Sequence, residues 1–231
     1  MNLLAVETST ENCSAAVYVD GEIAQISEIA PQKHAELILP MTELVLKQAG
    51  IGKEELNGIV FGKGPGSFTG VRIAASTAQG LALGLNLRCA GVSSLEALAM
   101  QALDGTDEEF AVAAIDARMG EVYCAVYDRC GAYPKALLEP KVLPPEAAVE
   151  AVFHALGARS AYAGGSGVEL LYAAGLNPNI IKRSDFPDAQ MIVKLGAVLF
   201  EQGKICDPEN ALPLYVRDDV AWKKVSEQGK H

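Results

Sequence analysis

Gly62-Lys-Gly-Pro-Gly-Ser-Phe-Thr-Gly-Val-Arg72 is the stretch around which the rest of the chain is organised. The apolar run Gly58-Ile-Val-Phe61 before it predicts a buried strand, and the small residues from Ile73 to Leu85 after it predict a helix. The glycines leave the backbone free to take positive φ or to approach another group closely, and the proline fixes one bend. We therefore expect a shaped turn that uses Gly62, Gly64, Pro65, Gly66, Ser67, Thr69, Gly70 and Arg72.

Two interpretations of this turn stay open. Ser67 or Thr69 can cap the helix, whose first N–H groups and positive dipole end then suit an anion. The stretch is not a phosphate-binding Walker loop, because no Gly-Lys-Ser/Thr ends it, and Thr69 stands where a G-x-G-x-x-G motif has its third glycine. The alternative is a tight strand-to-helix turn whose glycines serve packing.

The composition indicates a globular chain that does not bind nucleic acid by itself. Its 231 residues are 50% hydrophobic, which is enough for one large core or two smaller ones. The formal net charge of −10 disfavours direct contact with phosphates, so a role on nucleic acid would act through a partner. Five scattered cysteines without a C-x-x-C pair predict reduced thiols, and no apolar stretch is long enough for a membrane span, so we expect a cytoplasmic protein.

The second half of the chain repeats the pattern of the first. Leu3-Leu-Ala-Val6 predicts a buried strand that ends in Glu7, and a hairpin follows it. Phe110 to Ile115 ends in Asp116 in the same way, and a second hairpin follows there. Strand, acidic end and hairpin thus occur twice, which indicates an internal repeat.

We expect a duplicated α/β fold of the actin-like (ASKHA, RNase H-like) type, with two lobes of mixed sheets and a cleft between them. The polar segment Asp104 to Glu109 marks the boundary, so that residues 1–105 form the first lobe and residues 106–231 the second. The last helix or the tail can pack back on the first lobe. The other expected elements are the strands Ser14 to Tyr18, Glu22 to Ser27, Arg88 to Val92, Glu121 to Tyr127, Ala161 to Ala163 and Asn179 to Lys182, and the helices Leu95 to Leu103, Pro144 to Leu156, Val168 to Ala174 and Ala189 to Gln202.

The expected helix from His34 to Gly50 carries apolar residues on two sides. Pro40 predicts that this helix begins near Leu37, because the missing N–H then falls in the first turn. Such a helix is either deeply buried or lies between its own sheet and a partner chain. The helix after the glycine turn has a smooth face, and Gly80 within it costs about 1 kcal/mol relative to alanine, which indicates close packing against an internal or an external neighbour.

The ends of the two repeated strands meet in the expected cleft. A phosphate-transferring enzyme of this architecture needs an aspartate at each strand end, and Asp116 meets this requirement in the second half. The first half has Glu7 instead, followed by Thr8 and Ser9 rather than by a glycine that would let phosphate approach, which disfavours ATP hydrolysis by the chain alone. Asp116 and Arg118 form either an ionic clamp between the lobes or a ligand contact. The three histidines lie far apart in sequence, so no metal site is expected. The candidate cleft contacts are Glu7, Thr8, Ser9, Asp116 and Arg118.

Motifs along the whole chain resemble the TsaB family, also called YeaZ. They are Leu3 to Thr8, Gly62 to Arg72, Ala78 to Ala82, Gly91 to Leu95, Ile115 to Tyr123, and Leu214 to Arg217 with Ala221 to Lys224. The resemblance implies the actin-like fold and a role in making threonylcarbamoyladenosine (t6A) at adenosine 37 of tRNAs that read codons beginning with A. TsaB is similar to its paralogue TsaD, which attaches the threonylcarbamoyl group.

The comparison with TsaD implies a scaffold rather than an enzyme. TsaD follows its own Gly-Pro-Gly helix with two metal-binding histidines, and Ser94 and Leu98 stand at those positions here. The resemblance therefore implies no catalytic residue, no metal site, a heterodimer with TsaD, a homodimer in its absence, and the ATPase TsaE as a further partner. It implies no cofactor for the isolated chain and leaves open a nucleotide at the interface of the complex. The implied partner surface comprises His34, Leu37, Ile38, Met41, Leu44, Val45, Gly70, Ile73, Ala74, Thr77 and Leu81.

Two enzymatic alternatives remain. One is a metal-dependent glycoprotease-like peptidase, against which the absent histidine pair counts. The other is an ATP-dependent small-molecule kinase that uses the cleft, and a titration with ATP and magnesium that shows no heat would remove it.

Overall fold

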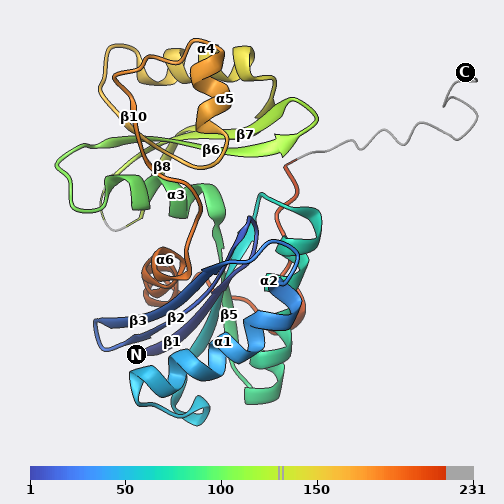
Figure 1. Ribbon diagram of the computed structural model, residues 1–231. Helices are drawn as coiled ribbons and strands as arrows, with labels where there is room; N and C mark the ends of the chain where they lie inside the picture. Colours follow the sequence, from blue (N-terminus) through green and yellow to red (C-terminus); the bar gives the residue numbers. More distant parts are fainter. Residues whose placement is uncertain (130, 132, 217–231) are drawn as a thin grey trace, which may run out of the picture.

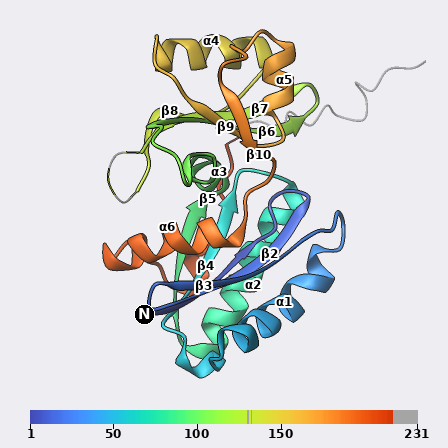
Figure 2. The same cartoon turned by 60° about the vertical axis from the view of Figure 1, so that its left-hand side comes forward.

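The computed structural model describes residues 1–129, 131 and 133–216, and it contains two lobes, each built on one five-stranded sheet (Figure 1). Each sheet has helices on both faces, as a second view shows (Figure 2). The expected duplicated α/β architecture with two mixed sheets is thereby confirmed. Along the described residues, no helix is both long and apolar enough to pass through a bilayer.

The first sheet has the strand order β3-β2-β1-β4-β5. The central strand β1 pairs antiparallel with β2 and parallel with β4. The hairpin between β2 and β3 turns at Asp20 and Gly21, where both residues have positive φ. The strands are β1 (Asn2–Glu7), β2 (Asn12–Val19), β3 (Glu22–Ile29), β4 (Gly58–Gly64) and β5 (Arg88–Ser93).

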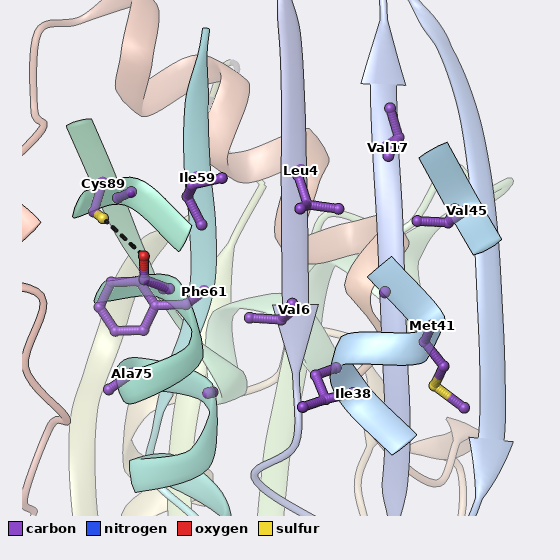
Figure 3. Close-up of a cluster of buried hydrophobic side chains, with 14 of the residues drawn as sticks. Leu4, Val6, Val17, Ile38, Met41, Val45, Ile59, Phe61, Ala75 and Cys89 are labelled. Atoms are coloured by element: carbon purple, nitrogen blue, oxygen red, sulfur yellow. Dashed lines mark hydrogen bonds between the residues drawn. The ribbon is translucent and has the colours of Figure 1, made fainter. Parts of the chain in front are cut away.

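Alternation along the strands divides the first lobe into two cores. Leu4 and Val6 of β1 face the helices α1 (His34–Ala49) and α2 (Phe68–Leu85). They belong to the same core as Ile38 and Met41 of α1 (Figure 3). Leu3 on the opposite face of β1 packs against α6 (Ala189–Glu201). Because successive side chains of a strand point to opposite faces, a continuous apolar run such as β1 serves both cores.

The second sheet repeats this topology with the order β10-β9-β6-β7-β8. Its central strand β6 pairs antiparallel with β7 and parallel with β9. One face carries α4 (Pro145–Leu156) and α5 (Val168–Ala173), and the other carries α3 (Ser94–Leu103). The strands are β6 (Phe110–Arg118), β7 (Glu121–Asp128), β8 (Lys135–Leu143), β9 (Tyr162–Gly164) and β10 (Ile181–Ser184).

Two helices pack on the sheet of one lobe although the expected boundary assigns them to the other lobe. The helix α3 precedes the expected boundary at residues 105 and 106 but packs on β6 and β9, whereas α6 comes near the end of the described chain but packs on β1, β2 and β4. The two helices also contact each other, so they join the lobes (Figure 1). The division at residues 105 and 106 itself stays a prediction.

Several element boundaries differ from the sequence-based expectation. The helix α1 begins at His34 rather than near Leu37, so Pro40 lies inside it. Pro40 has no N–H to donate to the Glu36 carbonyl, and both residues belong to the exposed side of the helix. The edge strand β8 is the second arm of the expected second hairpin, for which the sequence gave no residue range, and β10 lies two residues later than expected. Of the motifs that resemble the family, Arg217 and residues 221–224 lie outside the described residues.

Candidate functional site

The glycine stretch is a strand end, a short turn and a helix start. The strand β4 continues through Gly64, and α2 begins at Phe68, five residues before the expected start. The side chain of Ser67 caps the helix by accepting the Gly70 N–H at 3.3 Å. Thr69, the other candidate cap, is exposed.

Two glycines of this stretch let α2 approach the end of β1. A Cβ atom on Gly70 would lie 2.1 Å from the Thr8 carbonyl oxygen, and one on Gly66 would lie 2.3 Å from the Ser9 carbonyl oxygen. The Thr8 hydroxyl donates to the Gly70 carbonyl at 2.8 Å, and the Ser67 N–H donates to the Ser9 carbonyl at 2.7 Å. Close packing between backbones therefore explains these glycines, in agreement with the packing interpretation of the turn.

Glu7 lies beneath the turn and does not line the cleft. It is fully buried, with one carboxylate oxygen accepting from the Ser9 N–H and the other from the Ser94 hydroxyl at 3.0 Å. A Cβ on Gly62 would collide with this carboxylate, which explains that glycine as well. Burial raises the pKa of Glu7 above its usual value, and the hydrogen bonds from Ser9 and Ser94 oppose this shift.

A cavity of about 530 Å³ lies between the lobes. Ser9, Asp116 and Arg118 line it as expected, whereas Thr8 and Glu7 do not. The first residues of α1 and α2 and the last described segment of the chain also line this cavity. The lining residues are Ser9, Thr10, Glu11, Pro31, Gln32, His34, Pro65, Gly66, Ser67, Phe68, Val71, Ile115, Asp116, Ala117, Arg118, Tyr123, Ser166, Leu214, Tyr215 and Val216.

Arg118 forms ion pairs across the cleft. Its guanidinium lies 3.0 Å from Glu11 of the first lobe and 3.2 Å from Asp116 of its own lobe. This contact matches the clamp interpretation of the charged strand end. The Arg118 side chain is 73% exposed, and ion pairs between exposed groups contribute little to stability.

Six residues of the expected partner surface lie inside the first lobe instead. The helix α1 presents one face to the sheet, and the spacing of its buried residues matches that face. Four of them pack in the core between the first sheet and the helices α1 and α2. Gly70 packs against the Thr8 backbone, and His34 lines the cavity between the lobes. The six buried residues are His34, Ile38, Met41, Val45, Gly70 and Ala74.

The outer faces of α1 and α2 expose large apolar side chains among polar ones such as Glu43 and Lys47. Leu44 of α1 is 55% exposed, and Leu83 of α2 is 75% exposed. Leu39 and Phe68 are also exposed, although they were not among the expected residues. The five expected residues that reach this surface are Leu37, Leu44, Ile73, Thr77 and Leu81.

Gly80 and Gly84 add a smooth strip to the outer face of α2. A Cβ built on either glycine meets no atom within 4 Å among the described residues. Glycine destabilises a helix interior by about 1 kcal/mol relative to alanine, and packing within the described chain does not require it at these positions. The smooth face noted in the sequence is therefore turned outward at these two positions.

The two positions that correspond to histidines in TsaD have structural contacts here. Ser94 donates its hydroxyl to Glu7, and Leu98 is fully buried against the second sheet. Within the described residues, no three His, Cys, Asp or Glu side chains are grouped so that they would hold a metal ion.

Comparisons with known proteins agree with this architecture. The model of the TsaD family, tRNA N6-adenosine threonylcarbamoyltransferase, matches residues 26–224. The tRNA threonylcarbamoyladenosine biosynthesis protein TsaB of Escherichia coli is 38% identical, over 97% of this chain and 98% of that protein. TsaB of Haemophilus influenzae is 36% identical, over 97% of each chain.

A solved structure is similar over nearly the whole chain. YeaZ from Pseudomonas aeruginosa superposes with a TM-score of 0.83 at 34% identity, covering 93% of this chain and 99% of that one. The similarity confirms the two-lobed, ASKHA-like fold. Taken together, the repeated topology, the matched family model and these full-length relatives show that the chain belongs to the TsaB family.

Proposed function

We propose that this chain is a non-catalytic subunit in the biosynthesis of t6A in tRNA, and that it acts by binding TsaD through the outer faces of α1 and α2. The names of its full-length relatives support the pathway. The observation that carries the binding mode is the glycine strip of α2, Gly80 and Gly84, beside the exposed leucines of α1 and α2.

The shape of this surface suits a helix of the partner. Small residues spaced four apart on a helix let a second helix approach closely, and the neighbouring leucines then fill the flanks. The helices α1 and α2 lie side by side on one face of the first sheet, so the two form one continuous surface (Figure 1). Burying exposed leucines stabilises a complex by about 1.5–3 kcal/mol each when the burial is complete.

The non-catalytic role is supported by the contacts of Ser94 and Leu98. Ser94 holds the buried Glu7, and Leu98 fills the core between α3 and the second sheet. Both residues therefore serve the fold at positions where TsaD has its histidines. In this proposal the catalytic groups and most of the tRNA contacts belong to TsaD, which fits the net charge of −10.

The remaining partners follow from the family. We propose that the chain works in the cytoplasm, that TsaE joins the heterodimer, and that the chain forms a homodimer through the same surface when TsaD is absent. We also propose that any nucleotide of the complex binds at the interface of the subunits rather than to this chain alone.

The experiment is a rescue of t6A in cells depleted of this chain. Wild type and the control Phe153→Asp are expected to restore t6A in total tRNA, because Phe153 is equally exposed but lies on α4 of the other lobe. Leu44→Asp is expected to fold and to restore little t6A. Full rescue by Leu44→Asp together with Leu83→Asp would overturn the proposed surface, and failure of the wild type to restore t6A would overturn the proposed pathway.

A further inference from the structure

Cys89 and Cys206 face each other across an edge of the first sheet. Cys89 lies on the edge strand β5, and Cys206 lies in the segment that follows α6. The Cys89 N–H donates to the Cys206 carbonyl at 2.9 Å, and the Cys206 N–H donates to the Cys89 carbonyl at 2.8 Å. This reciprocal pair is an antiparallel bridge of two directly opposite residues.

The backbone spacing of such a bridge is compatible with a disulfide after a small movement. Directly opposite, hydrogen-bonded residues of antiparallel strands have Cα atoms about 5.5 Å apart, which lies inside the range of about 4.4–6.8 Å found for disulfides. Their Cβ atoms are about 5.5 Å apart and must approach to about 3.5–4.5 Å, so the bond requires a small shift of the segment after α6 toward β5. Opposite residues also point to the same side of a sheet. Both cysteines accordingly pack against the same core cluster, the one between the first sheet and α2.

The surroundings place the two sulfurs in different environments. Cys89 is fully buried, and its thiol donates to the Ala78 carbonyl of α2 at 3.9 Å (Figure 3). Cys206 is only partly buried. Arg88 and Asp207, which are the chain neighbours of Cys89 and Cys206, form an ion pair at 2.9 Å in the same register as the bridge between the cysteines.

We propose that Cys89 and Cys206 form a reversible disulfide when the protein meets a peroxide. The partly exposed Cys206 thiolate attacks the peroxide O–O bond, becomes a sulfenic acid and releases hydroxide, which leaves as water after taking a proton. The Cys89 sulfur then attacks the sulfenic sulfur, and the S–S bond forms as a second water leaves. Two thiols and one hydrogen peroxide thus give one disulfide and two waters, and an external dithiol reverses the step.

Burial raises the pKa of Cys89 to about 12 and also raises the pKa of Cys206, although the Arg88 charge favours the thiolate of both. We therefore expect slow formation, over minutes to hours at neutral pH. The product would tie the segment after α6 to β5. That segment runs on along α2, where Gln79 donates to the Ala211 carbonyl, and reaches β4, where Leu214 donates to the Lys63 carbonyl.

Peptide mapping of the full chain tests the proposal. Trypsin places the five cysteines in five different peptides, with Cys89 in residues 89–118 and Cys206 in residues 205–217. The native protein, in a Cys130→Ser background, is treated with peroxide, then denatured in the presence of the alkylating agent so that the buried thiols react, and digested without reductant. We expect the linked pair 89–118 with 205–217, while Cys13 and Cys124 remain alkylated, and we expect dithiothreitol to abolish the link.

Thermal unfolding supplies a second measurement. The disulfide closes a loop of more than 100 residues, which should raise Tm on the order of 10 °C in the oxidised protein, and Cys206→Ser should show no such rise. The proposal is overturned if both cysteines stay alkylated after prolonged oxidation of the native protein. It is also overturned if Cys89 pairs with Cys13 or Cys124 instead, or if the link forms only in the denatured chain.

Discussion

The substitution Gly80→Ala distinguishes a role of Gly80 in partner binding from a role in the stability of the fold. A Cβ at Gly80 meets nothing within 4 Å, and the residue lies in the interior of the 18-residue helix α2. Alanine should therefore stabilise the free chain by about 1 kcal/mol through its higher helix propensity. If a TsaD helix packs on this strip, the same methyl group overpacks the interface by about 1–3 kcal/mol, which weakens binding roughly 5- to 150-fold.

Gly70→Ala is the matched control, because it is the same change in the same helix. Its Cβ would lie 2.1 Å from the Thr8 carbonyl oxygen, so we expect a loss of stability of about 1–3 kcal/mol. Urea unfolding of the free proteins, at concentrations low enough for the homodimer to dissociate, and calorimetric titration with TsaD give the two quantities for each variant. The reasoning is refuted if Gly80→Ala destabilises the free chain, or if it binds TsaD as tightly as the wild type.

Other predictions concern the burial and the charges of the first lobe. Met41→Asp should abolish folding, because Met41 is 4% exposed in the core, whereas Leu44→Asp should change the free energy of unfolding by less than about 1 kcal/mol, as circular dichroism melts will show. Because burial raises the pKa of Glu7 in the folded state, the wild type should lose stability relative to Glu7→Gln as pH rises above 4.5, the ordinary pKa of a glutamate. The difference should level off above the folded pKa, and urea unfolding between about pH 4 and pH 8 will reveal it; a constant difference would contradict the burial argument. Arg118→Ala should cost at most about 1 kcal/mol in a melt, because its ion pair with Glu11 is exposed.

Much of the fold is readable from the sequence because the repeated elements carry strong local signals. The runs Leu3 to Val6 and Phe110 to Ile115 are apolar enough to mark central strands, and the Asp20-Gly21 dipeptide marks the hairpin between β2 and β3. The edge strand β8 gave no comparable signal, because Lys135–Leu143 includes Pro140 and its side chains are only partly buried. Packing of α3 and α6 on the opposite lobes depends on contacts between residues far apart in sequence, which local patterns do not encode.

The candidate surface was predicted at the level of helices but not of single residues. The apolar pattern of α1 is two-sided, so it does not distinguish Ile38, which faces the sheet, from Leu44, which faces outward. The position of the sheet determines which face of α1 is buried. The helix start was predicted too late because Pro40 was expected in the first turn, whereas the exposed side of the helix tolerates a missing hydrogen bond. Gly80 predicted a smooth helix face, but only the structure shows that this face is open among the described residues rather than packed against an internal neighbour.

Light scattering on a sizing column measures whether the chain binds TsaD through the outer faces of α1 and α2. The chain is run alone and mixed with TsaD from the same organism, beside Leu44→Asp, Gly80→Leu and the control Phe153→Asp. The account predicts that the wild type and Phe153→Asp form a one-to-one heterodimer with TsaD, and that the two surface variants stay folded but elute apart from it. Heterodimers of normal stability with both surface variants would contradict the assignment of the partner surface to α1 and α2.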